Sequence, residues 1–180
     1  MPVTRLRDYQ MIIHNLILYE NIDVLKKWCL QFCREALLES NEIVLILSEY
    51  DSIKYALNDL TDNNTLGKMK NDGSLIIVDS KKGFYSMLDR FVGIIIMVKM
   101  LLTRAETHRK NGVTVVSDTG IFFHLNRIDD LIKHESMISS TVSHLKVKIN
   151  CAYNSNDYAG LNDGQKQLLQ SSHNKIISID

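Results

Sequence analysis

The sequence lacks a phosphate-binding loop at the place where its pattern would put one. An apolar run at 16–19 is typical of a buried strand, and an amphipathic helical pattern follows within a few residues. The turn between them, residues 20–23, reads ENID instead of G-x-x-x-x-G-K-[ST]. Lys26 and Lys27 lie inside the predicted helix rather than at its start, so the amide nest and lysine that hold β- and γ-phosphates are missing. We therefore expect no ATP hydrolysis and no tight, magnesium-dependent binding of ATP.

Other absences narrow the class of protein. Lys and Arg (21) balance Asp and Glu (21), so no basic excess attracts nucleic acid. The first ten residues are charged and lack the apolar core of a signal peptide. The longest apolar run, 91–102, contains Lys99 and is shorter than the roughly 20 residues that span a bilayer. These features predict an intracellular, cytoplasmic protein that contacts neither membrane nor nucleic acid directly.

The chain has three cysteines, too few and too scattered for a disulfide framework. Cys29 and Cys33 are four apart on a predicted helix, and a metal site with Cys151 and a histidine would be one reading of them. No C-x-x-C or H-E-x-x-H spacing supports that reading, and buried free cysteine usually packs as a small apolar residue. A nucleophilic Cys–His pair stays open, but nothing selects one of the six histidines as its base. We assign no metal ligand, cofactor or catalytic residue.

Hydrophobic periodicity predicts strands alternating with helices. The strand-like runs are rich in Ile, Val and Leu, as expected of strands covered on both faces, and lie at 12–19, 43–48, 75–79, 113–117, 147–153 and 175–179. The first helical pattern begins after the capping residue Asn21, and four more cover about 52–60, 86–110, 126–143 and 163–172. The asparagine-rich stretch 62–64 is predicted as a turn. The third helix is apolar nearly all round in its middle, which indicates burial in the core or at a dimer surface. The sequence has one proline, at position 2, and no linker-like stretch interrupts the pattern. The whole chain, 1–180, is therefore predicted to be one three-layer α/β domain with a central, mostly parallel sheet flanked by helices.

Polar side chains follow directly on several predicted strands. Tyr19, Asp79, Asp118 and Tyr153 stand at four strand ends, and the carboxyl ends of parallel strands are where ligands bind in such folds. The stretch 113–118 resembles the strand that ends in a metal-supporting Asp in phosphate-loop enzymes, but without that loop it has little to act on. Strand ends are also polar in any α/β protein because they turn into loops, so an empty rim is the competing interpretation.

The order of several short motifs resembles a known family. The motifs are His14 five positions before Tyr19-Glu20, Asp72-Gly73 before the strand ending at Asp79, Gly112 before the strand ending at Ser117-Asp118, Glu135 on the next helix, Cys151-x-Tyr153 closing a strand, and His173 before the last strand. Together they resemble the MEDS domain, a sensory domain of methanogens and methylotrophs that is also found in DcmR-type regulators. Two segments depart from the family pattern: Asn154 stands where an acidic residue is expected, and Thr119-Gly120 stands where a glycine and tryptophan are expected.

The resemblance implies a RecA/KaiC-like fold that has lost its phosphate loop. It also implies a non-catalytic sensory or regulatory domain that binds a small molecule or a regulatory protein partner in signal transduction, with homodimerisation a further candidate. A degenerate nucleotide-binding protein and a structural scaffold are the alternatives. The predicted ligand-binding residues are Tyr19, Glu20, Asp79, Asp118, Glu135, Tyr153 and His173.

Overall fold

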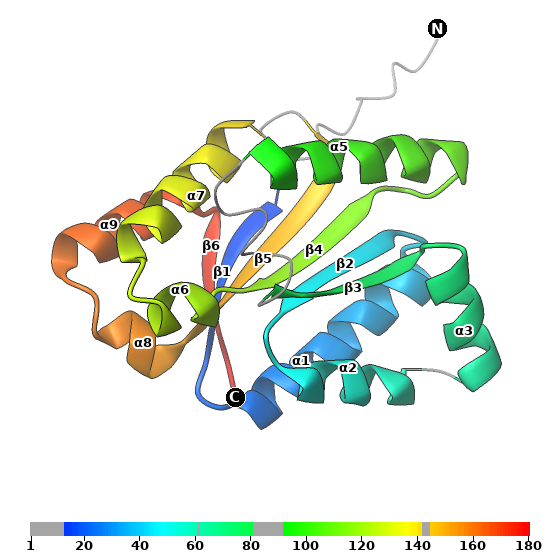
Figure 1. The fold of residues 1–180 in the computed structure, drawn as a ribbon, viewed down its shortest axis with the longest axis horizontal. Coiled ribbons are helices and arrows are strands. Elements are labelled where there is room, and N and C mark those ends of the chain that lie inside the picture. Colours follow the sequence, from blue (N-terminus) through cyan, green and yellow to red (C-terminus); the bar gives the residue numbers. More distant parts are fainter. Residues whose placement is uncertain (1–12, 61, 81–91, 142–144) are drawn as a thin grey trace, which may run out of the picture.

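The computed structural model describes residues 13–60, 62–80, 92–141 and 145–180, which form a three-layer α/β domain around one sheet (Figure 1). Within these ranges the sheet has six strands in the order β3-β2-β4-β5-β1-β6, and every pair is parallel. The strands are β1 (Ile13–Tyr19), β2 (Ile43–Ser48), β3 (Leu75–Asp79), β4 (Val113–Asp118), β5 (Val147–Asn154) and β6 (Lys175–Ile179). Their carboxyl ends therefore share one edge of the sheet, as the sequence predicts.

Both faces of the sheet are covered by helices, which is why its central strands are almost continuously apolar. One face packs against α1 (Ile22–Arg34), the π-helical turn η1 (Glu35–Glu39), α2 (Asp51–Ala56), the 3-10 turn η2 (Leu57–Asp59) and α3 (Asn63–Asn71). The other packs against α5 (Val92–Thr107), α6 (Gly120–His124), α7 (Ile128–Thr141) and α9 (Asp163–Ser172), and Figure 1 shows these two groups on opposite sides. The short helix α8 (Ser155–Ala159) follows β5 directly.

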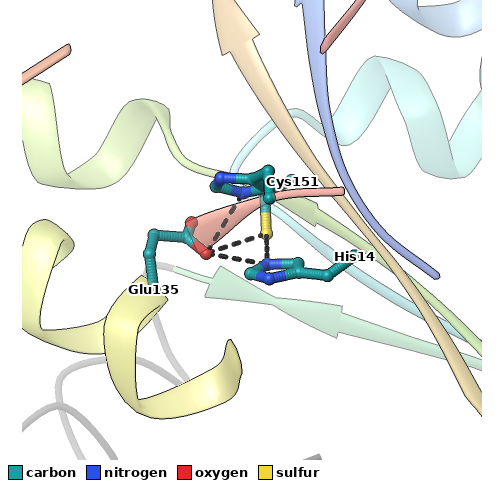
Figure 2. A group of neighbouring side chains, drawn as sticks. His14, Glu135 and Cys151 are labelled. Carbon is teal, nitrogen blue, oxygen red and sulfur yellow. Dashed lines mark hydrogen bonds and ion pairs between the residues drawn. The ribbon is translucent and has the colours of Figure 1, made fainter. Parts of the chain in front are cut away.

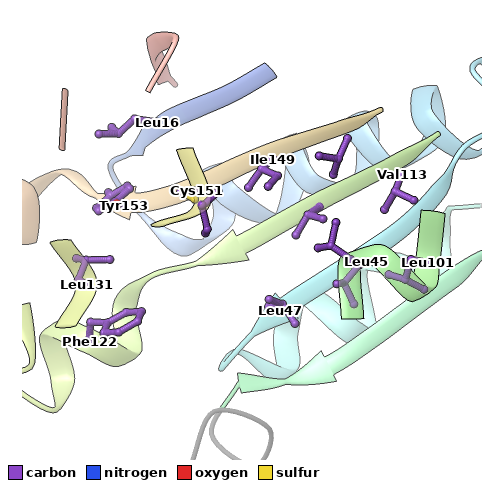
Figure 3. Packing of buried hydrophobic residues seen from close by; sticks show 14 of the residues in the cluster. Leu16, Leu45, Leu47, Leu101, Val113, Phe122, Leu131, Ile149, Cys151 and Tyr153 are labelled. Atoms are coloured by element: carbon purple, nitrogen blue, oxygen red, sulfur yellow. The ribbon is translucent and has the colours of Figure 1, made fainter. Parts of the chain in front are cut away.

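Side chains on the central strands alternate between two hydrophobic clusters. Leu45 belongs to the cluster under α5 and α7, whereas its neighbours Val44 and Ile46 belong to the cluster under α1 and α2. Figure 3 shows the first of these clusters, in which Cys151 and Tyr153 of β5 lie with aliphatic side chains. The sheet consequently separates the interior into an α1 side and an α7 side.

Local sequence explains where the helices begin. The Asn21 side chain accepts hydrogen bonds from the amides of Asp23 and Val24, both at 3.1 Å, so α1 starts immediately after β1. Asn162 forms a capping box with Gln165 at the start of α9. The predicted helix 163–172 matches α9, and the six predicted strands match the observed ones to within one residue, except that residue 12 lies outside the described ranges.

Two predictions about helices were wrong in part. The stretch 62–64 is not a free turn, because the Asp62 side chain caps the amides of Asn64 and Thr65 and so begins α3. Burial of the third helix in the core on all sides is wrong, since Ile96 and Met100 of α5 are 51% and 67% exposed in the single chain. Burial at a dimer surface stays a prediction. The predicted start of the third helix, 86–91, and the predicted end of the fourth, 142–143, lie outside the described residues.

Candidate functional site

The first group of polar side chains lies at the carboxyl ends of β1 and β4, on the α1 side. The Tyr19 hydroxyl is 3.4 Å from Oδ1 of Asp118, and the amide of Gly120 donates to the same oxygen at 3.1 Å. Oδ2 of Asp118 is buried and has no hydrogen-bond partner among the described residues. A Cβ at Gly120 would lie 2.9 Å from Oε1 of Glu49 and 3.3 Å from Oδ1 of Asp118, so the two carboxylates approach the backbone here more closely than a side chain would allow.

Burial controls the protonation of this group. It raises the pKa of the Asp118 carboxyl to about 7, against the opposing hydrogen bond from Gly120 and with further repulsion from the charges of Glu49 and Asp157. Burial and the neighbouring Asp118 also raise the pKa of Tyr19. The carboxyl therefore changes charge near neutral pH, and its second oxygen is buried without a hydrogen-bond partner among the described residues.

A second group lies deeper, on the α7 side of the sheet. Glu135 of α7 faces His14 of β1 and Cys151 of β5, and Figure 2 shows these three side chains pointing toward one another. Nε2 of His14 is 3.0 Å from Oε2 of Glu135, and Sγ of Cys151 is 3.4 Å from the same oxygen. The Tyr153 hydroxyl donates to the other carboxylate oxygen, Oε1, at 2.7 Å, and Nε2 of His173 is 3.5 Å from Oε2. The carboxylate is completely buried.

The electrostatics of this second group depend on Glu135. Burial alone would raise the pKa of this carboxyl, but the hydrogen bonds and charges of His14 and His173 outweigh it and hold the pKa well below its ordinary value. The carboxylate in turn adds to the effect of burial on Cys151 and Tyr153, whose pKa values are raised well above the ordinary range. Cys151 is thus a buried thiol and not an accessible nucleophile.

Comparisons with known proteins identify the fold of this chain. No family model matches the sequence, and no curated protein matches it. Among solved structures, the flagellar accessory protein FlaH from Methanocaldococcus jannaschii superposes with a TM-score of 0.55 at 14% identity, over 93% of this chain and 72% of that chain. The fold is RecA-like. At this identity the likeness concerns the fold and not the activity.

The RecA-like fold makes the connection between β1 and α1 informative. Only Glu20 and Asn21 separate Tyr19, the last residue of β1, from Ile22, the first of α1. The amides of Asp23 and Val24, in the first turn of α1, donate to the side chain of Asn21. They are therefore not available to bind a phosphate. The sequence argument against a phosphate loop therefore has a structural counterpart: the turn is too short and its helix is capped internally.

The seven predicted site residues do not converge on one rim. Tyr19 and Asp118 meet on the α1 side, while Glu135, Tyr153 and His173 meet on the α7 side. Asp79 ends β3 at the far edge of the sheet, where it lies 3.8 Å from Lys54. Glu20 is exposed, and its carbonyl accepts a weak hydrogen bond from Asn154. The physical reasons are the strand order and the alternation of side chains across the sheet.

Two members of the buried group were not among the predicted site residues, although the family motifs contain both. His14 and Cys151 lie on the same face as Tyr153 and contact the same carboxylate, Glu135. The signal in the sequence is the C-x-Y spacing, because residues two apart on a strand share a face. Cys29 and Cys33 pack in the opposite cluster, so the metal site of three cysteines considered from the sequence is not formed.

A cavity of about 550 Å³ opens at the amino ends of the strands, away from the Asp118 group. Its wall includes Asn15, Gly112 and the ion pair between Glu42 and Lys148, whose Oε1 and Nζ atoms are 2.6 Å apart. Ile13 lies in the same wall. The cavity does not coincide with the predicted rim.

None of the helices within the described ranges is long and apolar enough to cross a bilayer.

Proposed function

We propose that this chain is a non-catalytic, RecA-like sensory or regulatory domain that binds a small molecule beside Asp118. The observation that carries the proposal is the combination found where β1 and β4 end. The two-residue turn leaves no cradle for a triphosphate, whereas Asp118 keeps one buried carboxylate oxygen without a partner among the described residues.

The chemistry of this corner indicates the class of ligand. Carboxylate oxygens of Asp118 and Glu49 both lie beside Gly120, at 3.3 Å and 2.9 Å from the position that a Cβ would take there. A buried carboxylate is stabilised by a cation or by a hydrogen-bond donor. A small organic cation or an N–H or O–H donor therefore suits the site better than a phosphate, which would add negative charge.

The resemblance to MEDS domains supports a sensory role, because those domains act in signal transduction without a phosphate loop. In this proposal the output passes through a regulatory protein partner or through a second copy of the chain. The domain would respond to its ligand without turnover.

A degenerate nucleotide-binding protein is the second candidate. It is favoured by the fold shared with FlaH and by the position of Asp118 at the end of β4. Such a protein would use Asp118 and base stacking without contacts to the triphosphate. A scaffold with an empty rim is the third candidate.

A thermal-shift screen separates the three candidates. The probes are methylamine, ethanolamine and putrescine as small cations, and adenosine, AMP and ATP with and without magnesium. We expect a small cation or donor to stabilise the wild type, to lose its effect in Asp118→Asn, and to keep it in the control Asp79→Asn. Stabilisation by adenosine and AMP alone favours the second candidate, and no response to any probe favours the scaffold. Micromolar binding of Mg-ATP by calorimetry would overturn the proposal.

A further inference from the structure

The buried group on the α7 side contains four side chains that are common metal ligands. His14, Glu135, Cys151 and His173 each offer one donor atom, and these atoms all lie within 4.8 Å of one another. The group is separate from the Asp118 corner because it occupies the opposite face of the sheet. The proposed function assigns no role to His14 or Cys151.

The separations between the donor atoms match a small coordination sphere. From Oε2 of Glu135, the distances are 3.0 Å to Nε2 of His14, 3.4 Å to Sγ of Cys151 and 3.5 Å to Nε2 of His173. Sγ of Cys151 is also 3.5 Å from Nε2 of His14. Ligands bound to zinc at about 2.0–2.3 Å in a tetrahedron lie about 3.3–3.8 Å from one another. Three of the six separations therefore lie within the tetrahedral range before any ion is bound, and a fourth, from Glu135 to His14, is shorter at 3.0 Å.

His173 supplies an independent indication that a cation belongs here. Its Nδ1 lies 2.6 Å from the carbonyl oxygen of Leu169, a contact that requires Nδ1 to carry the proton. Nε2 faces Oε2 of Glu135 at 3.5 Å. There it either carries a proton and pairs with the carboxylate, which lowers the pKa of Glu135, or, in the neutral ring, presents a lone pair. A lone pair facing a carboxylate is repulsive, and a positive ion between the two reverses that repulsion. The bond from Nδ1 to a backbone carbonyl is the arrangement that orients histidine ligands in metal sites.

A divalent ion is compatible with the charge balance of these four side chains. A divalent ion with one thiolate, one carboxylate and two neutral imidazoles has no net charge, which suits a site closed off from water. On binding, the Cys151 thiol releases its proton to solvent and the Nε2 proton of His14 moves to Nδ1, which has no other partner among the described residues. The hydrogen bond from Tyr153 to Oε1 of Glu135 fixes the carboxylate with Oε2 toward the other donors.

We propose that His14, Glu135, Cys151 and His173 bind one zinc-type divalent ion in a closed, four-coordinate structural site. Mixed nitrogen, sulfur and oxygen donors in a tetrahedron select zinc over magnesium or calcium, which prefer oxygen ligands in larger spheres. All four positions are taken by protein atoms and the site is buried, so it has no open position for catalysis. The ion would tie together β1, β5, α7 and the end of α9.

The test uses reduced, metal-free full-length protein. Cobalt(II) is titrated while the thiolate-to-cobalt charge-transfer band and the visible spectrum of tetrahedral cobalt are recorded, and zinc is counted by elemental analysis after dialysis. We expect one ion per chain and both spectral features in the wild type. We also expect zinc to raise the melting temperature of the metal-free protein.

Variants assign the ion to these residues. The chain has three cysteines, so the double variant Cys29→Ser/Cys33→Ser leaves Cys151 as the single thiol, and we expect it to keep the charge-transfer band. Cys151→Ser should lose the band, and His173→Gln should weaken zinc affinity by at least about 10- to 100-fold. Should Cys151→Ser fail to fold, the double variant still decides which thiol binds.

Two results would overturn the site. One is a folded wild type that takes up no zinc and gives no cobalt band. The other is a band that disappears in the double variant and persists in Cys151→Ser. Neither result affects the proposal for Asp118, because that site lies on the other face of the sheet and is tested with different probes.

Discussion

Replacing Asp118 with asparagine should make the protein more stable at alkaline pH. The folded-state pKa of this carboxyl is about 7, against an ordinary value of 3.8 in the unfolded chain. Because the folded-state value is raised, the stability it contributes is fully present below pH 3.8 and is lost as the pH rises through about 7. At 1.36 kcal/mol per pKa unit, the full loss is about 4 kcal/mol.

The amide removes this dependence while keeping the local contacts. Its Oδ1 atom can still accept from the Tyr19 hydroxyl and the Gly120 amide. The free energy of unfolding of Asp118→Asn, relative to wild type, should therefore rise by about 2–3 kcal/mol between about pH 5 and about pH 8.5. Urea denaturation of metal-free protein, analysed by linear extrapolation at each pH, measures this difference.

Asp79→Asn is the matched control. Asp79 also ends a strand at the same edge of the sheet, but its side chain is 24% exposed and lies beside Lys54. Its stability should follow the wild type across the same pH range. A difference between wild type and Asp118→Asn that stays constant from acid to alkaline pH would refute the argument that burial keeps this carboxyl protonated.

Three further substitutions test single contacts by the same urea method. Tyr153→Phe removes the donor to Oε1 of Glu135 and leaves a buried carboxylate oxygen unpaired, which should cost about 1–3 kcal/mol. Asn21→Ala removes the cap of α1 and should cost about 1 kcal/mol. Gly73→Ala places a side chain at φ 70° against Arg104, and the left-handed backbone alone should cost about 1–2 kcal/mol.

Each of these three predictions has a clear contrary outcome. A neutral Tyr153→Phe would mean that the Glu135 carboxylate does not depend on that donor. Unchanged stability in Asn21→Ala would mean that water satisfies the first amides of α1 equally well. For Gly73→Ala, wild-type stability would show that the turn before β3 relaxes without cost.

The sequence predicted the strands well because their chemistry is local. Each run of Ile, Val and Leu in β2 or β4 is long enough for a strand and too short for a buried helix, and polar turn residues follow it. α3 was missed because Asn63, Asn64 and Gly67 are poor helix formers. The deciding residue was Asp62, whose side chain caps the helix and stabilises a weak sequence.

The geometry of the site was less accessible to sequence reasoning. The prediction that Tyr19 and Tyr153 lie on one rim took into account that parallel strands end at the same edge of the sheet. It did not take into account that successive side chains on a strand point to opposite faces. In the register between β1 and β5, Tyr153 pairs with Leu18, so Tyr19 and Tyr153 point to opposite faces. The edge position of Asp79 depended on strand order, which local periodicity does not contain.

The position of β1 in the sheet has a consequence for how the chain reaches its native state. Among the described strands, β1 pairs with β5 and β6 alone, and these two come last in the described sequence. The contact between His14 and Cys151 spans 137 positions. During synthesis an apolar strand must therefore wait without its neighbours until nearly the whole chain has been made. Such long-range pairing slows folding and lengthens the time for which apolar edges are exposed to aggregation. Shortening that wait, for example by a circular permutation that places β1 after β5, should accelerate refolding while leaving the folded packing unchanged.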